Sequence, residues 1–156
     1  MSSFRLAGLD PAPFASLFLL DDAQLAARGI ARRFADADRG FPCRVGLEDA
    51  RSGDELLLLP YEHQPAHSPY RASGPIFVRR DAQRRVLAPG EVPPYVAERL
   101  ISLRAYDVAH LMVDAEVCEG SAVAPWLEAA FRRVEIAYVH LHNARRGCYS
   151  CLAERA

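Results

Sequence analysis

The chain has 156 residues, of which 51% are hydrophobic and 25% charged, and it carries a formal net charge of −1. This length and composition predict a single globular domain over residues 1–156 that can bury a core without a disulfide or a metal. The near-neutral charge offers no electrostatic attraction for nucleic acid or for an acidic membrane, so neither is expected as a partner.

The basic residues are all arginine, 19 in number, and the chain contains no lysine. A Schiff base to pyridoxal phosphate needs a lysine, and so does a P-loop that holds a β/γ-phosphate. The sequence also lacks the glycine-rich, HExxH and GxSxG patterns of common enzyme classes. No cofactor is therefore expected.

The apolar run at residues 14–20 is short. Asp10, Pro11 and Pro13 precede it, and Asp21 and Asp22 follow it. It does not fit a signal peptide or a membrane span, so a cytoplasmic location is expected. The four cysteines are then expected to be reduced thiols rather than a disulfide framework.

In chain order, hydrophobic alternation and turn residues predict short strands separated by a few helices. The first half reads as a strand at 4–9, helices at 11–20 and 21–28, and strands at 30–34, 43–47 and 56–61. The second half reads as a proline-rich loop at 62–75, a strand at 76–80, a short helix near 96–100, strands at 101–107 and 110–117, a helix at 122–133, and a final hairpin of 135–144 and 148–154. The predicted fold class is α+β, a mostly antiparallel sheet with two or three helices packed on it.

The final hairpin contains the densest group of chemically active side chains, HLHNARRGCYSC at residues 140–151. Residues two apart on a strand share a face, so His140 and His142 are predicted to project together. Cys148 and Cys151 are three apart and would point to opposite faces. This CxxC pair is therefore not expected to chelate one ion.

The turn of this hairpin decides which sulfur lies near the histidines. A three-residue loop ending at Gly147 in the left-handed conformation would pair Leu141 with Cys151 and place Cys148 diagonally beside His142, with Tyr149 on the core face. A two-residue loop would instead pair His140 with Cys151.

Three interpretations of this cluster are open. In the first, Cys148 is a nucleophile, His142 is its base and Asn143 orients the ring. In the second, His140, His142 and Cys148 bind a metal, although no metal is favoured. In the third, the residues have structural roles only, as most buried cysteines and sheet histidines do.

The loop at 62–75 is a second candidate site. Its ligand-binding candidates are His63, His67, Tyr70, Arg71 and Ser73, held on a backbone stiffened by proline. Arg71 with Arg79 or Arg104 could clamp a carboxylate or phosphate bidentately. Ser102, Arg104 and Tyr106 share the polar face of a predicted strand, and His140 is the candidate from the final hairpin. A merely solvated loop is the alternative.

Three stretches together resemble a family of short bacterial proteins defined as a domain of unknown function. They are SPYRASGPIFVR at 68–79, ISLRAYD at 101–107, and HLHNARRGCY at 140–149 with the terminal ERA. The resemblance runs over the whole chain. It implies a stand-alone bacterial cytoplasmic domain and assigns no catalytic or ligand residue.

Two functions from different classes follow. The first is a protein that binds a small polar or anionic ligand where the 62–75 loop meets the final hairpin, with Cys-His chemistry as an extension. The second is a non-catalytic homodimeric binding or regulatory module that associates through an exposed strand, because the apolar final hairpin could end the sheet at an edge.

Overall fold

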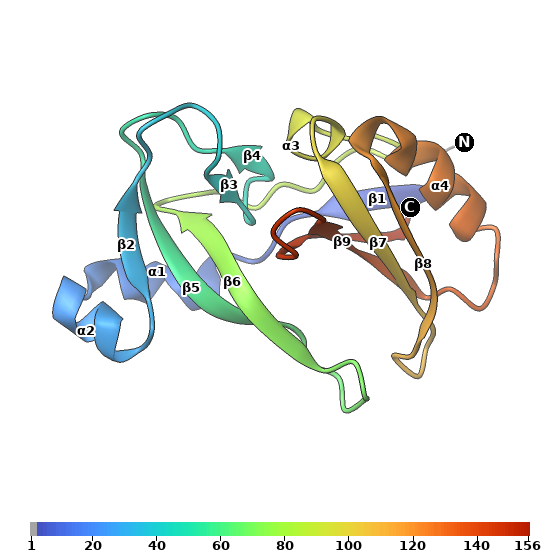
Figure 1. Ribbon diagram of the computed structural model, residues 1–156, viewed down its shortest axis with the longest axis horizontal. Helices are drawn as coiled ribbons and strands as arrows, with labels where there is room; N and C mark the ends of the chain where they lie inside the picture. The colour runs from blue at the N-terminus through green and yellow to red at the C-terminus, as the bar shows by residue number, and fades with distance from the viewer. Residues whose placement is uncertain (1–2) are drawn as a thin grey trace.

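The computed structural model describes residues 3–156, and within them the strands form two five-stranded sheets (Figure 1). The first sheet is antiparallel, in the order β1 (Phe4–Ala7), β10 (Tyr149–Arg155), β9 (Tyr138–Asn143), β7 (Leu100–Tyr106) and β8 (Met112–Glu119). The second has the order β2 (Ala31–Phe34), β5 (Glu55–Gln64), β6 (Ala72–Arg79), β3 (Pro42–Cys43) and β4 (Glu48–Asp49). Its β3 and β6 are parallel and its other pairs antiparallel.

The prediction of one sheet is therefore wrong, although the prevalence of antiparallel strands is confirmed. The first sheet takes its edge strand β1 from the start of the chain and the other four strands from its second half. Alternation along a strand shows which side chains share a face, but it does not show which strand is the neighbour. The division into two sheets is thus a tertiary property.

Short helices cover the sheets. They are α1 (Ala12–Ala15) with the 3-10 helix η1 (Ser16–Leu19), α2 (Asp22–Ala27), α3 (Pro94–Ala97), and α4 (Val123–Ala130) after the 3-10 turn η2 (Gly120–Ala122). The described residues thus hold four α-helices, one in each helical segment predicted along the chain, whereas the predicted fold had two or three helices packed on the sheet. Asp21 caps α2 through a reciprocal capping box with Gln24, and Gly29 follows it with a φ of 71°. None of the described helices is long and apolar enough to cross a membrane.

Each sheet contributes one face to an apolar cluster. In the first, Ile101, Leu103 and Leu141 pack with Leu127 of α4. In the second, residues such as Leu57 pack beneath α1, η1 and α2. The opposite face of β7 and β9 is left for polar and aromatic side chains, because residues alternate across a strand.

Two other predicted elements differ from the structure. Most of the predicted loop at 62–75 belongs to a hairpin, because β5 continues to Gln64 and β6 begins at Ala72. Pro65 and Pro69 lie in the turn between the two strands, where no ladder hydrogen bond is needed, and Pro75 lies in β6 opposite Pro60 of β5. The predicted strand at 43–47 is limited to β3, and the Leu47 N–H closes a turn onto the Cys43 carbonyl.

The final hairpin is present, with a different turn and a bulge. Cys151 faces Leu141 as predicted, but Tyr149 faces His142, and the register shifts between Tyr149 and Cys151. The turn is four residues long, because the Ala144 N–H donates to Leu100 of β7 instead of closing the hairpin. Gly147 has the predicted positive φ, at 78°. The bulge turns Tyr149 away from the core face predicted for it.

The hairpin is also not an edge. β9 lies between β10 and β7, and β10 lies between β1 and β9, so the outer strands of the first sheet are β1 and β8. The outer side of β1 is hydrogen-bonded to the segment 85–90. The motive for placing a dimer contact at the final hairpin is therefore removed.

Gly8 joins the first strand to the segments at 44–45 and 84–85. Its N–H donates to the Arg85 carbonyl at 2.8 Å, and the next N–H, of Leu9, donates to the Arg44 carbonyl at 2.9 Å. A Cβ added at Gly8 would lie 2.1 Å from the Val45 carbonyl oxygen. Only glycine fits this crossing without a backbone shift.

We expect Gly8→Ala to lower the free energy of unfolding by about 2 kcal/mol or more, because backbone must move to admit the methyl group. Gly74→Ala is the matched control, since its Cβ would meet nothing within 4 Å. Urea unfolding followed by circular dichroism measures both. Equal stabilities of the two variants would contradict this account of Gly8.

Candidate functional site

The candidate site lies on the polar face of β7 and β9, where the end of β5 approaches it. Register places Ser102 opposite His142, Arg104 opposite His140, and Tyr106 opposite Tyr138. Paired residues in neighbouring strands share a face, so these side chains form one continuous surface. The shared face of Ser102, Arg104 and Tyr106 predicted from the sequence is present in β7.

Three histidines converge on this surface. His63 comes from β5 in the second sheet, and its ring centroid lies 4.9 Å from that of His142 and 6.2 Å from that of His140. His140 and His142 are 6.4 Å apart. His142 is fully buried and His140 is 6% exposed. The two sheets therefore meet through imidazole rings.

Tyrosines hold these rings in place. Tyr149 stacks on His63 with an interplanar angle of 10°, and it presents its edge to His140 and His142. Tyr106 and Tyr138 lie 5.1 and 5.2 Å from His140 on its other sides. Such aromatic pairs orient a ring beyond what area burial alone does. The bulge in β10 is what brings Tyr149 to this face.

The hydrogen bonds of His142 define its tautomer. Its Nδ1 lies 3.1 Å from the Gly147 carbonyl oxygen, which can only accept, so Nδ1 carries the proton. The neutral ring then has a lone pair on Nε2. This Nε2 is buried and has no hydrogen-bond partner among residues 3–156.

Two further ring nitrogens are in the same condition, since Nδ1 of His63 and Nδ1 of His140 are buried without a partner in the described part of the chain. Buried polar atoms in folded proteins are nearly always paired, because an unpaired one costs about 1–3 kcal/mol. Three such atoms in one cluster make this surface the candidate site.

The histidines are uncharged at neutral pH. Burial lowers the pKa of His140 to about 3, with the neighbouring imidazoles and Arg104 adding to the effect. Burial, followed by the charge of Arg104, lowers the pKa of His142 to about 4. The same two causes lower the pKa of His63. The positive charge of the surface therefore resides on Arg104.

Arg104 has no salt bridge within residues 3–156. Its Nε donates to Ser102 Oγ at 3.4 Å, a long hydrogen bond, and no carboxylate lies within ion-pair distance in the described chain. A partly buried guanidinium without a counter-charge attracts an anion, and its planar donors match a carboxylate or a phosphate.

A pocket of about 610 Å³ opens on the other flank of His140. Its lining residues are His63, Gln64, Pro65, Ala66, His110, Ala137, Tyr138, His140, Leu152 and Glu154. Leu152, His140 and Arg104 form one row across β10, β9 and β7. The pocket and the guanidinium thus lie on opposite sides of one imidazole, and the volume suits a small molecule.

A family model described as a protein of unknown function, DUF1203, matches residues 40–155. The chain belongs to this family. The match contains every residue of the histidine cluster, together with Arg104 and the whole final hairpin, whereas β1, α1, α2 and β2 lie before it. No curated protein and no solved structure matches the chain.

For this DUF1203 member, the sequence candidates divide into three groups in space. His63, His140, His142 and Arg104 come together, and Tyr70 touches their margin through an edge contact with Tyr106 at 6.0 Å. The hairpin tip also approaches this end, since Ser68 Oγ donates to the His110 carbonyl at 3.0 Å. The loop candidates nearer the tip do not join the cluster.

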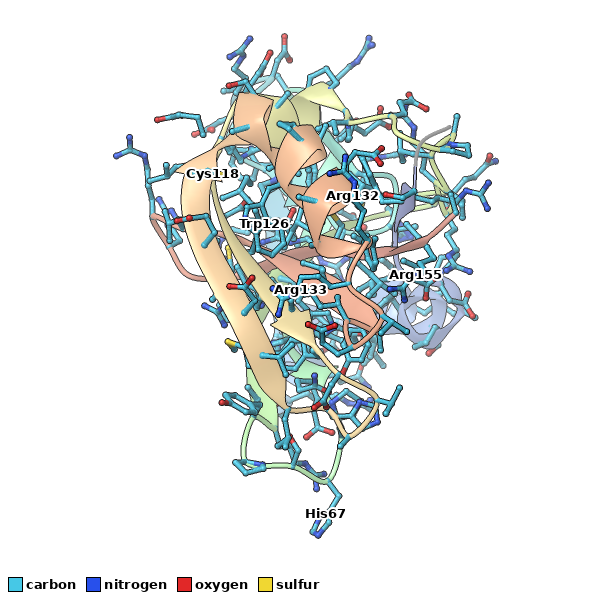
Figure 2. All side chains as sticks on the ribbon, turned by 90° about the vertical axis from the view of Figure 1, so that its right-hand side faces the viewer. His67, Cys118, Trp126, Arg132, Arg133 and Arg155 are labelled. Atoms are coloured by element: carbon cyan, nitrogen blue, oxygen red, sulfur yellow. The ribbon has the colours of Figure 1, made fainter. Side chains whose placement is uncertain are left out.

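These loop candidates are solvent-exposed. His67 lies at the extremity of the hairpin, away from both sheets (Figure 2). Arg71 pairs with Glu62 at 3.2 Å, and both side chains are exposed. Ser73 lies exposed on β6. None of the three has a contact with the histidine rings among the described interactions.

Cys148 and Asn143 form a separate group. The sulfur of Cys148 accepts from Arg44 Nη2 at 3.0 Å, and Asn143 Nδ2 lies 3.7 Å from it. No hydrogen bond joins Cys148 to His142 in the described residues; the partners of the sulfur are Arg44 and Asn143. Among these residues, no group of three or more His, Cys, Asp or Glu side chains has the spacing to hold a metal ion.

Sequence reasoning missed Tyr149, Tyr138 and Arg44 as parts of these two groups. Tyr149 was missed because the bulge reverses its face. Arg44 had a visible signal, since it stands between Cys43 and Val45 in an apolar stretch where an arginine must find internal partners.

The low pKa of His140 makes folding stability depend on pH. An unfolded histidine titrates near about 6.5, so between that value and about 3 the unfolded chain binds a proton that the folded chain does not. His140 therefore makes the free energy of unfolding fall as pH falls, by about 1.4 kcal/mol per pH unit. Above this window its contribution is fully present.

We expect His140→Gln to reduce the slope of unfolding free energy against pH by about 1.4 kcal/mol per unit between roughly pH 6 and pH 4. Denaturant titrations across this range measure it. His67→Gln, at the exposed hairpin tip, is the control and should keep the wild-type slope. Identical slopes for wild type and His140→Gln would contradict the burial of an uncharged His140.

Proposed function

We propose that the protein binds a small oxyanion, a phosphate or a carboxylate, on the surface between its two sheets, with Arg104 as the cationic anchor. The observation that carries this proposal is the coincidence of an arginine without an ion pair and three buried imidazole nitrogens without partners. Charge and hydrogen-bonding capacity are both left open at one place. An oxyanion supplies what each of them lacks.

The tautomer of His142 narrows the ligand further. With Nδ1–H donating to Gly147, the free Nε2 of the neutral ring can only accept a hydrogen bond. A ligand that satisfies both Arg104 and His142 needs an anionic oxygen and a hydroxyl close together. Hydrogen phosphate and 2-hydroxy carboxylates have both groups, whereas acetate has only the first.

The charges around the pocket orient such a ligand. Arg104 of β7 does not line the pocket but lies opposite His140 in the strand register, whereas the exposed Glu154 of β10 is one of the pocket's lining residues. An anionic group is attracted to the first and repelled by the second. The remainder of the ligand would then extend over Leu152 and Ala137 toward solvent.

A metal is less compatible with this surface. Histidine nitrogens are common metal ligands, but the charge of Arg104 would repel a cation from all three rings. Cys148, which would be the sulfur ligand of a metal held by His140 and His142, accepts a hydrogen bond from Arg44 instead.

A homodimer would form most readily at the exposed edge strand β8. As an outer strand it offers backbone N–H and C=O groups for strand addition, and Val113 and Val117 are exposed on it. Glu116 and Glu119 are exposed on the same strand, and an antiparallel pair of copies would bring these like charges together. Oxyanion binding is therefore the function that the geometry supports better.

Arg104→Gln tests the anchor. We expect inorganic phosphate to bind the wild-type protein in calorimetric titration, and the variant to bind about tenfold more weakly or worse, a loss of at least about 1.4 kcal/mol. Arg146→Gln removes the same charge from an exposed turn residue and should keep the wild-type affinity. An equal loss in both variants, or no binding to the wild type, would refute the proposal.

The role of His142 has its own test with two small acids. Glycolate should bind more tightly than acetate, because only glycolate has a hydroxyl for the free Nε2. His142→Phe keeps a ring of similar size and should abolish this preference while leaving acetate binding within about twofold of wild type. Nuclear magnetic resonance titrations give both affinities. A variant that still prefers glycolate would show that His142 is not the acceptor.

A further inference from the structure

Arg44 is a buried cation without a carboxylate. Its side chain is 1% exposed, yet it forms no ion pair in the described part of the chain. Nε donates to the Tyr149 carbonyl at 2.8 Å, Nη1 donates to the Pro42 carbonyl at 2.6 Å, and Nη2 donates to Cys148 Sγ at 3.0 Å. Of these three acceptors, only the sulfur can become an anion.

Four titratable groups near Arg44 stay neutral. Burial raises the pKa of Tyr95 and of Tyr149 well above the usual value, and it raises the pKa of Cys151 to about 12. His142, whose pKa is held at about 4, is neutral as well. Cys43, next in sequence, is fully buried and accepts from the Arg79 N–H at 3.3 Å. The two tyrosines, Cys151 and His142 therefore do not balance the charge of Arg44.

Asn143 provides a second observation beside the sulfur. Its side chain is 9% exposed, its Nδ2 lies 3.7 Å from Cys148 Sγ, and its Oδ1 is buried without a partner among the described residues. An amide oxygen without a donor next to a thiol is available to accept from a hydroxyl formed on that sulfur.

We propose that Cys148, whose sulfur accepts a hydrogen bond from the buried guanidinium of Arg44, is a site of modification by peroxides and other small electrophiles. A buried guanidinium strongly favours an anion beside it, and a thiolate beside an arginine is the reactive form of cysteine. Cys148 is only partly buried, so a small reagent reaches it, unlike the buried Cys43 and Cys151.

The reaction with a peroxide balances as follows. The Cys148 sulfur attacks one peroxide oxygen, an S–O bond forms, and the O–O bond breaks. The leaving oxygen departs as hydroxide or alkoxide and takes a proton from solvent, so the sulfur is oxidised to sulfenic acid and the peroxide is reduced. The new S–OH hydrogen can donate to the open Oδ1 of Asn143, and Arg44 remains beside the sulfur.

The chain has an internal control in Cys118, which lies on the edge strand β8 (Figure 2) and is also partly buried. Burial, with the neighbouring Glu116 and Glu119, raises the pKa of the Cys118 thiol. The two cysteines have comparable access and opposite charge surroundings. Any difference in their rates therefore reports the effect of charge.

We expect iodoacetamide and hydrogen peroxide at neutral pH to modify Cys148 roughly tenfold faster than Cys118, or more, as measured by peptide mass spectrometry on the wild-type protein. Thiolate absorbance in the ultraviolet, taken as the difference between wild type and Cys148→Ser, detects the anion even where a reagent reaches the sulfur slowly. Cys118→Ser is the matched control and should leave that absorbance unchanged at neutral pH. Absence of a Cys148 thiolate at neutral pH, or modification of Cys118 at an equal rate with no such absorbance, would overturn the proposal.

Discussion

The buried guanidinium of Arg44 joins the two sheets at the place where the candidate site is built. It binds Pro42 of β3 in the second sheet and the carbonyl of Tyr149 of β10 in the first. An arginine buried without these acceptors would strongly destabilise the fold. Its hydrogen bonds therefore hold β3 and β10 at a fixed position relative to each other. Tyr149 is thereby held against His63, and the imidazoles of both sheets are brought together.

From this junction, two chemically different environments extend to either side of Tyr149. On one side, neutral imidazoles surround a cation that has no ion pair, which is an arrangement suited to an oxyanion. On the other, a thiol lies against a buried cation. Gly147 and Tyr149 flank Cys148 in the chain, and both contact histidines of the oxyanion surface. The side chain of Cys148 itself contacts Arg44, so one short segment, 147–149, contributes to both environments.

Several parts of this arrangement could be predicted from sequence because their causes are local. The alternation of Ser102 and Arg104 with Ile101 and Leu103 places polar and apolar side chains on opposite faces of β7, whatever its neighbours are. The same rule correctly puts His140 and His142 on one face. Gly147 takes the left-handed conformation because its turn needs it.

What the sequence by itself determined is thus the approximate position of most strands and the face on which side chains such as Arg104, His140 and His142 lie, since both follow from the two-residue repeat of an extended chain. Only the tertiary structure decided that His63 would meet His142, that a bulge would bring Tyr149 between them, and that Cys148 would bond to Arg44 rather than to an imidazole. These contacts join segments that are distant in the chain, so they depend on which strands pair. Alternative pairings differ in the apolar area they bury and in the hydrogen bonds they form over the whole molecule. A local sequence pattern does not show which of these pairings is the most stable.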